Sequence, residues 1–371
     1  MSLTKIIKVN PVSIQADGIL QAAKVLIGGG LVIIPTETVY GIAANALNIN
    51  ALERLYKIKN RPKDKPYSVL IGHKHKVQEL CRQIPVIAYK LMNKFWPGPL
   101  TIILKSAGTG TIGLRMPDHP VALAIITQAA IPLVCPSANL SGNPAPVDFE
   151  HSIQEMNGLV DLAIDAGPAK IGLESTIVDL SSPEPRIIRS GAIKDELIMA
   201  VVKSKNVLFV CTGNSCRSVM AEAYLNKLLR KQQRTDIQVS SAGIMALAGM
   251  GASQETREVL ANEGIDASSH RAQRVTKELL DCSDIILVME SVHEDQILKI
   301  SPEVKNRLFL LKEFAALSGN RDIINNIKNP GIPKTGSSDL DIPDPVGGSF
   351  EFYRDTFSTI KEAVERISKV L

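Results

Sequence analysis

The first half of the chain alternates apolar runs with segments whose apolar residues recur at helical spacing. Residues 18–30 have the helical spacing and end in three glycines, and residues 31–38 continue as an apolar run that stops at a proline. This order predicts a helix, a turn and a buried strand. The runs IPLVC (131–135) and ESTIVDL (174–180) predict two more strands that open into polar loops.

The second half repeats a strand–helix alternation. Apolar runs predict strands at 207–211, 237–243 and 284–289, and helical spacing predicts helices at 217–232, 254–263, 292–299 and 350–369. This alternation predicts an α/β fold with a parallel sheet flanked by helices. The Pro- and Ser-rich stretch near 181 comes before the first of these strands, so we expect two domains, 1–200 and 204–371, with the boundary near 200–204.

Composition agrees with two folded domains and indicates the cellular compartment in which we expect them. The 371 residues are 45% hydrophobic and 22% charged, which are ordinary globular values. No apolar run reaches the roughly 18 residues of a membrane helix, and the N-terminus has no secretory pattern. Five cysteines, an odd number, do not indicate a disulfide framework, so we expect a cytoplasmic protein without a membrane partner. The net charge of +4 suits anionic small ligands as well as nucleic acid.

The segment from Cys211 to Arg217 has the composition of a phosphate-binding loop. It joins a predicted strand to a predicted helix, where backbone N–H groups and the helix N-terminus favour a phosphate dianion and a cysteine thiolate. Arg217 can bind two phosphate oxygens, Ser218 can donate to the thiolate, and Asn214 can brace the turn. A phosphatase also needs an acid for the leaving group, and Asp344 and Asp341 are the two candidates.

Residues 205–371 resemble the low-molecular-weight protein phosphatases. The resemblance rests on CTGNSCRS (211–218), SSAG (240–243), DIILVM (284–289) and an Asp-Pro loop at 344. It implies a phosphorylated protein substrate, Cys211 as nucleophile, Arg217 as phosphate ligand and Asp344 as general acid. It also implies a reversible disulfide between Cys211 and Cys216 under oxidant. The implied phosphate-binding loop consists of Thr212, Gly213, Asn214, Ser215, Cys216 and Ser218.

The resemblance leaves the phosphatase substrate open. Tyrosine-directed members have a bulky aliphatic residue where this chain has Ser215, and aromatic residues where it has DPVGG (344–348). Small residues there favour phosphoarginine over phosphotyrosine, because protein-arginine phosphatases carry threonine at the first position. Arsenate reductases share the loop motif and remain an alternative. They use further cysteines at and after the strand 284–289, however, whereas Cys282 of this chain precedes it.

The first half contains six polar segments in one order: PTETVYG (35–41), KNRPKDKP (59–66), FWPGPLT (95–101), GLRMPDHP (113–120), PSANLSG (136–142) and ESTIVD (174–179). Their cations and hydroxyls suit a polyphosphate together with a small zwitterion. In this order they resemble the YrdC-type threonylcarbamoyl-AMP synthases, over about residues 8–195. The resemblance implies a twisted α/β domain that converts L-threonine, bicarbonate and ATP into threonylcarbamoyl-AMP and pyrophosphate.

The same resemblance implies the site residues and partners of the first half. The ATP-binding set is Lys59, Arg61, Lys65, Ser137, Asn139 and Arg189, and the threonine-binding set is Thr38, Arg115 and Ser175. Some relatives carry a histidine where this chain has Leu70. Mg²⁺ would accompany ATP as part of the substrate, since no dedicated carboxylate cluster and no tightly bound cofactor is indicated. The product would serve tRNA modification, with tRNA and downstream modification proteins as partners.

We therefore predict a bifunctional enzyme. One alternative treats the first half as an RNA-binding module without catalysis, because its predicted surface is basic. A second alternative, carbamoyl transfer in maturation chemistry, would usually bring acylphosphatase or zinc-binding segments, and the sequence contains neither.

Overall fold

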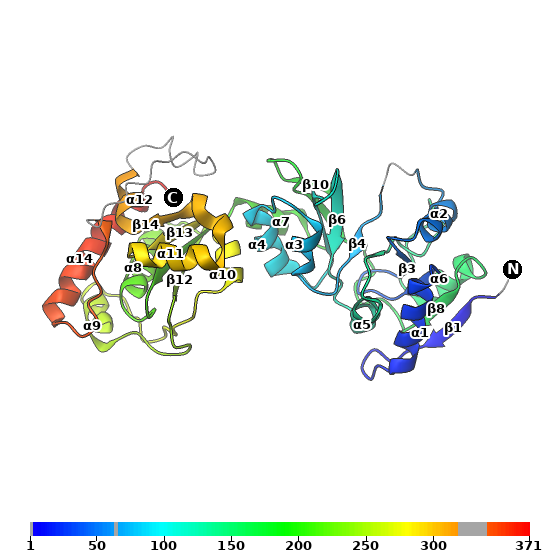
Figure 1. Cartoon of the computed structure of the whole chain (residues 1–371), viewed down its shortest axis with the longest axis horizontal. Coiled ribbons are helices and arrows are strands. Elements are labelled where there is room, and N and C mark those ends of the chain that lie inside the picture. The colour runs from blue at the N-terminus through cyan, green and yellow to red at the C-terminus, as the bar shows by residue number, and fades with distance from the viewer. Residues whose placement is uncertain (1–2, 63–65, 318–339) are drawn as a thin grey trace. The chain divides into compact units, whose positions relative to one another are not determined.

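The chain divides into two compact units, Met1–Val202 and Lys203–Leu371, in a computed structural model that describes residues 3–62, 66–317 and 340–371 (Figure 1). Within these ranges we find no helix with both the length and the apolar character needed to cross a membrane.

The first unit is built on a mixed sheet that has ten strands in the described residues, in the order β1-β8-β2-β3-β7-β4-β6-β5-β9-β10. Its strands are β1 (Lys5–Lys8), β2 (Val32–Ile34), β3 (Gly41–Asn45), β4 (Val69–Leu70), β5 (Leu100–Lys105), β6 (Thr111–Arg115), β7 (Leu133–Val134), β8 (Leu162–Asp165), β9 (Thr176–Asp179) and β10 (Arg186–Arg189). Its helices are α1 (Ala16–Ile27), α2 (Ile49–Ile58), α3 (Lys76–Leu80), α4 (Val86–Phe95), α5 (Pro120–Ala129), α6 (Phe149–Met156) and α7 (Asp195–Lys203).

Alternating side chains of β2 enter two separate cores. Ile33 packs in a cluster that contains Leu91 of α4, whereas Val32 and Ile34 pack in a second cluster with α1 and α5. Successive side chains of a strand point to opposite faces, so the apolar run is buried on both sides. The predicted helix and the three predicted strands of this half are confirmed as α1, β2, β7 and β9.

The second unit has a sheet of four parallel strands in the described residues, in the order β12-β11-β13-β14. Its strands are β11 (Lys205–Cys211), β12 (Ile237–Gly243), β13 (Ile285–Val288) and β14 (Leu308–Leu310). Its helices are α8 (Arg217–Lys231), α9 (Gln254–Asn262), α10 (Lys277–Asp281), α11 (Ser291–Ile300), the 3-10 helix η1 (Pro302–Arg307), α12 (Leu311–Leu317) and α14 (Phe350–Ile367).

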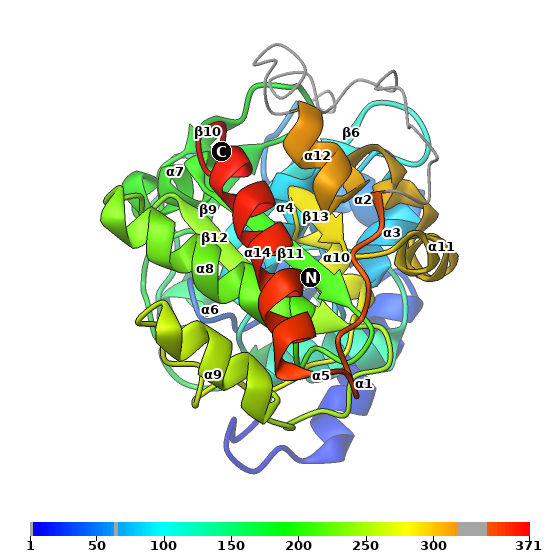
Figure 2. The same ribbon diagram turned by 90° about the vertical axis from the view of Figure 1, so that its left-hand side faces the viewer.

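Helices cover both faces of this parallel sheet. Val207, Phe209 and Cys211 of β11 pack toward α8 and α14, which lie side by side (Figure 2), and Val210 packs toward α10 and α11. The predicted parallel sheet flanked by helices is thus confirmed. The sequence pattern missed β14 and the short helices, because segments of three to seven residues carry too few positions to show a period.

Candidate active sites

The predicted phosphate-binding loop lies at the carboxyl end of β11, the strand between β12 and β13 in the sheet of the second unit. Strand β11 ends at Cys211, and α8 begins at Arg217. Asn214 has a left-handed backbone with φ 53°, which closes the loop. The loop passes so close to Gly243 of β12 that a Cβ atom there would lie 2.7 Å from the Thr212 carbonyl oxygen. Gly243 is therefore required for the loop to adopt this path.

The side chain of Asn214 braces the loop from inside. Its Oδ1 accepts a hydrogen bond from the backbone N–H of Gln273 at 2.9 Å, which fixes the orientation of the amide. Its Nδ2 therefore donates to the hydroxyls of Ser218, at 3.0 Å, and Ser241, at 2.8 Å. Ser241 donates in turn to Glu222, whose pKa is raised by burial. The predicted bracing role of Asn214 thus involves three further residues that the sequence alone did not indicate.

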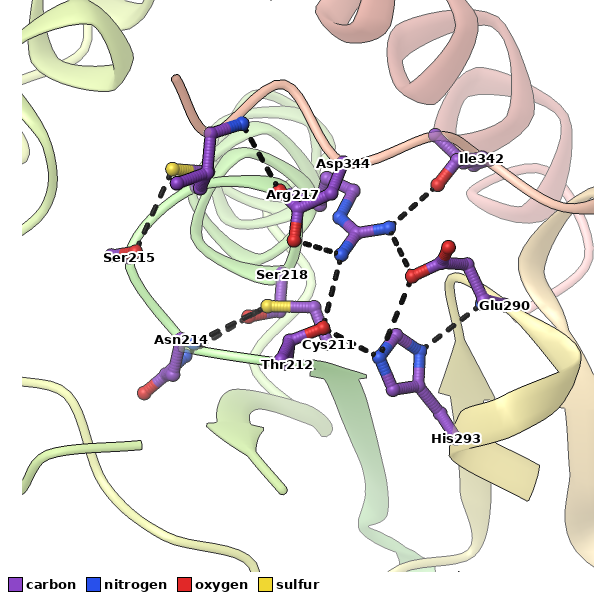
Figure 3. Close-up of polar contacts among 12 residues, drawn as sticks. Cys211, Thr212, Asn214, Ser215, Arg217, Ser218, Glu290, His293, Ile342 and Asp344 are labelled. Carbon is purple, nitrogen blue, oxygen red and sulfur yellow. Dashed lines mark hydrogen bonds and ion pairs between the residues drawn. The ribbon is translucent and has the colours of Figure 1, made fainter. Parts of the chain in front are cut away.

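The sulfur of Cys211 lies inside the loop, near two hydrogen-bond donors (Figure 3). Its Sγ is 3.0 Å from the Ser218 hydroxyl and 3.3 Å from the backbone nitrogen of Asn214. Burial raises the pKa of the thiol, whereas the Ser218 hydrogen bonds and the Arg217 charge oppose that rise. The lowered pKa expected from the loop is therefore wrong for this conformation, in which carboxylates neutralise Arg217.

The guanidinium of Arg217 is fully buried and makes four hydrogen bonds (Figure 3). One nitrogen, NH1, donates to Glu290 at 2.6 Å and to the Ile342 carbonyl at 2.7 Å. The other, NH2, donates to Thr212 and to Asp344. Its Nε has no acceptor among the described residues. This geometry leaves Nε as a donor for a phosphoryl oxygen.

Of the two candidate acids, Asp344 is the one that contacts Arg217. Its Oδ2 is paired with Arg217, and a third of its side chain is exposed. Asp341 instead accepts hydrogen bonds from the backbone nitrogen and hydroxyl of Ser291, at 2.8 and 3.2 Å, where α11 begins. These contacts make Asp341 a cap of α11.

Two further loop residues, Ser215 and Cys216, contact each other and residues outside the loop. The Ser215 hydroxyl is 3.6 Å from the Cys216 sulfur, which also lies 3.6 Å from the Ser253 hydroxyl and 3.7 Å from the Tyr353 hydroxyl. Both Cys211 and Cys216 are free thiols in this conformation, so their disulfide stays a prediction.

Sequence reasoning missed Glu290 and His293, which follow β13. Glu290 is an ion-pair partner of Arg217, and the His293 ring is 3.0 Å from the Thr212 hydroxyl. Both follow the carboxyl end of a parallel strand next to β11, and ligands of open α/β sheets bind at that end. Their position after the third predicted strand of this half could have revealed them.

In the first unit, Thr38 and Arg115 form a buried pair of predicted threonine ligands. Arg115 donates through NH2 to the Thr38 hydroxyl at 2.8 Å and to Glu37 at 2.7 Å. The side chains of Arg115 and Glu37 are 10% and 3% exposed, so this ion pair is shielded from water. The sequence did not indicate Glu37 as a site residue.

Ser175, the third predicted threonine ligand, contacts a predicted ATP ligand. Arg189 donates to the Ser175 carbonyl oxygen through Nε at 3.0 Å and to its hydroxyl through NH2 at 3.1 Å. Its NH1 donates to Glu174 at 2.7 Å. The structure therefore brings a predicted threonine ligand, Ser175, into contact with a predicted ATP ligand, Arg189.

Three of the predicted ATP ligands form one hydrogen-bonded group. Lys59 donates to the carbonyl oxygen of Ser137 at 2.9 Å and to the side-chain oxygen of Asn139 at 3.0 Å. Ser137 also donates to that oxygen. Burial lowers the pKa of Lys59 to about 8. Arg61 lies over the Tyr67 ring at 4.8 Å, and Lys65 lies outside the described residues.

Polar atoms without a partner gather around Arg115. In the described ranges, Oε2 of Glu37, Nε of Arg115 and Nδ1 of His119 are buried and make no hydrogen bond. Buried polar atoms are nearly always paired, so such a group favours a polar ligand with both donors and acceptors. No group of three or more metal-ligating side chains is present in the part of the chain that the structure describes.

Comparison with known proteins assigns each unit to a family. The Sua5/YciO/YrdC family model, described as "Telomere recombination", matches residues 24–191, and that of the low-molecular-weight phosphotyrosine protein phosphatases matches residues 206–337. A Mycobacterium tuberculosis relative of the synthases is 38% identical over 197 residues, which are 51% of this chain and 90% of its own. The protein-arginine-phosphatase of Geobacillus stearothermophilus is 36% identical over 165 residues, 44% of this chain and 95% of its own. The chain belongs to both families.

Two further relatives of the first unit show how much of each chain the similarity covers. The threonylcarbamoyl-AMP synthase of Bacillus subtilis is 42% identical over 194 residues, which are 50% of this chain. The chain spans 56% of that synthase and thus about half the length of the curated relatives that it first matches. The crystal structure of P. abyssi Sua5 with L-threonine is 28% identical, with a TM-score of 0.52, and the match covers 64% of this chain and 92% of that one.

Proposed function

We propose that the synthase unit forms threonylcarbamoyl-AMP and pyrophosphate from L-threonine, bicarbonate and ATP. The observation that carries this proposal is the unpaired acceptor and donor at Glu37 and Arg115, beside Thr38. An amino acid supplies the complement, since its ammonium group donates to Glu37 and its carboxylate accepts from Arg115. The P. abyssi relative was crystallised with this amino acid.

The proposed reaction has two steps. The threonine nitrogen, after losing a proton, bonds to the carbon of bicarbonate, and loss of water leaves the N-carboxylate. An oxygen of this carboxylate then attacks the α-phosphorus of ATP, and the bond to the bridging oxygen breaks to release pyrophosphate. Lys59, Arg61 and Lys65, with Arg189, would neutralise the triphosphate, and Ser137 and Asn139 would position it. Mg²⁺ would arrive with ATP.

Glu37→Gln should raise the KM for threonine about tenfold and change the KM for ATP less than twofold. Glutamine keeps an oxygen for Arg115 but loses the charge that binds the ammonium group, and a hydrogen bond to a charged group is worth about 1.5–3 kcal/mol. Pyrophosphate release at varied threonine would measure this. Asp118→Asn removes the same charge from an exposed neighbour and serves as the control. An unchanged KM in Glu37→Gln would remove Glu37 from the site.

We propose that the phosphatase unit hydrolyses phosphorylated side chains of proteins. A phosphoryl group that displaces Asp344 from Arg217 would free the guanidinium charge, and this charge favours the Cys211 thiolate. The displaced Asp344 carboxylate takes up the proton that the Cys211 thiol loses, and it gives this proton to the departing nitrogen or oxygen as the sulfur attacks phosphorus. Water then cleaves the sulfur–phosphorus bond and releases inorganic phosphate. Thr212, Gly213 and Asn214 to Ser218 would enclose the phosphoryl group.

We propose phosphoarginine over phosphotyrosine as the substrate class, because Ser215 and Val346 leave room for a planar polar group. Ser215→Ile should lower kcat/KM for phosphoarginine about tenfold and keep or raise that for phosphotyrosine, since one pocket contact is worth about 1–3 kcal/mol of discrimination. Assays with both phosphorylated substrates would measure this ratio. A wild-type enzyme that cleaves only phosphotyrosine would contradict the assignment.

The partners follow from these activities as proposals. The adenylate would pass to proteins that modify tRNA, and the phosphatase unit would bind phosphorylated proteins. We place both activities in the cytoplasm, because five cysteines, an odd number, do not indicate a disulfide framework.

A further inference from the structure

The Thr212 hydroxyl lies between the guanidinium of Arg217 and the ring of His293 (Figure 3). The hydroxyl oxygen is 3.2 Å from NH2 of Arg217 and 3.0 Å from Nε2 of His293. The His293 contact lies outside the residues that carried the phosphatase resemblance, because His293 comes from α11 on another segment of the chain.

Local geometry fixes the proton on the His293 ring. The backbone N–H of Glu290 donates to Nδ1 at 3.2 Å, so Nδ1 carries no proton. Burial and the nearby Arg217 lower the pKa of His293 to about 4, which keeps the ring neutral at ordinary pH. A neutral imidazole has one N–H group, and here it must be at Nε2. Nε2 therefore donates to Thr212, at 3.0 Å, since the Glu290 carboxylate oxygen lies 3.7 Å away and beyond hydrogen-bond distance.

The Thr212 oxygen consequently accepts two hydrogen bonds, one from His293 and one from Arg217. A hydroxyl oxygen has two lone pairs and one proton. Because both lone pairs of Thr212 accept hydrogen bonds, only its proton is left to form another one. Arg217, the neighbour of this hydroxyl, is the proposed ligand of the phosphoryl group. The Thr212 proton and the Arg217 Nε, which has no acceptor among the described residues, then remain as two donors.

We propose that His293 is a positioning residue that directs the Thr212 hydroxyl to donate a hydrogen bond to an oxygen of the phosphoryl group. The inference rests on the proposed phosphatase function and adds a specific pair of residues to it. His293 does not touch the substrate, and it acts by occupying the lone pair that would otherwise let Thr212 accept from another donor.

Two substitutions of His293 separate this role from a structural one. His293→Asn keeps an oxygen near the position of Nδ1 for the Glu290 N–H but does not reach Thr212. His293→Gln places an amide donor near the position of Nε2. We expect His293→Asn to lower kcat/KM for an aryl phosphate about tenfold or more and to weaken inhibition by inorganic phosphate, and we expect His293→Gln to stay within about threefold of wild type.

A double-mutant cycle with Thr212 completes the test. Thr212→Val should lower kcat/KM about as much as His293→Asn, Thr212→Ser should lose less than Thr212→Val because it keeps the hydroxyl, and the double variant Thr212→Val/His293→Asn should be no worse than Thr212→Val. Additive losses, or full activity in His293→Asn, would overturn the inference while leaving the phosphatase function in place. A wild-type protein without phosphatase activity would overturn both.

Discussion

Cys211→Ser is expected to lower hydrolysis of an aryl phosphate by about 10⁴-fold or more, which corresponds to about 5 kcal/mol of transition-state stabilisation. The serine hydroxyl can occupy the same place between Ser218 and the Asn214 nitrogen. It does not ionise at neutral pH, however, and therefore lacks the nucleophilicity of a thiolate. Phosphate release from the purified full-length chain would measure the loss.

The control for this result is Cys282→Ser, which changes the same atom at the end of α10, away from the phosphate-binding loop. It should retain full activity. If Cys211→Ser hydrolyses the substrate at the wild-type rate, the covalent mechanism is wrong.

Asp344→Asn is expected to slow hydrolysis of substrates with poor leaving groups by about 10²- to 10⁴-fold, the usual range for a positioned general acid. The amide can still accept from Arg217 but has no acidic proton for the departing atom. The loss should shrink as the leaving group becomes more acidic, because a good leaving group departs without protonation. A series of aryl phosphates of graded leaving-group pKa would show this dependence.

Asp341→Asn is the matched control, because Asp341 caps α11 through Ser291 and does not contact Arg217 in the described structure. It should retain the wild-type rate throughout the series. If Asp341→Asn alone is damaging, the acid has been assigned to the wrong residue.

The sequence predicted the parts of the site that belong to one continuous segment. The loop from Cys211 to Ser218 joins a strand to a helix, and both elements are long enough to show their period. The alternation of strands and helices also predicted the parallel sheet, because this arrangement follows from short connections between neighbouring elements.

Contacts between distant segments could not be predicted in the same way. The bonds from Arg217 to Glu290 and from His293 to Thr212 join residues 73 and 81 positions apart. The lowered pKa of Cys211 was predicted from the cations and N–H groups of the loop, but burial and the carboxylates on Arg217 depend on the complete fold. In the synthase unit, the pairing of Glu37 with Arg115 spans 78 positions and was missed for the same reason.

The most direct test of the bifunctional assignment is to measure pyrophosphate release and phosphatase activity on the whole chain and on its Cys211→Ser variant. Each protein is incubated with ATP, L-threonine and bicarbonate, and each component is omitted in turn. We predict that both proteins release pyrophosphate only when all three components are present, whereas only the wild type hydrolyses a phosphorylated substrate. Pyrophosphate release that does not depend on threonine would contradict the account. So would the absence of ATP consumption in a protein that binds RNA tightly, which a separate RNA-binding assay would show.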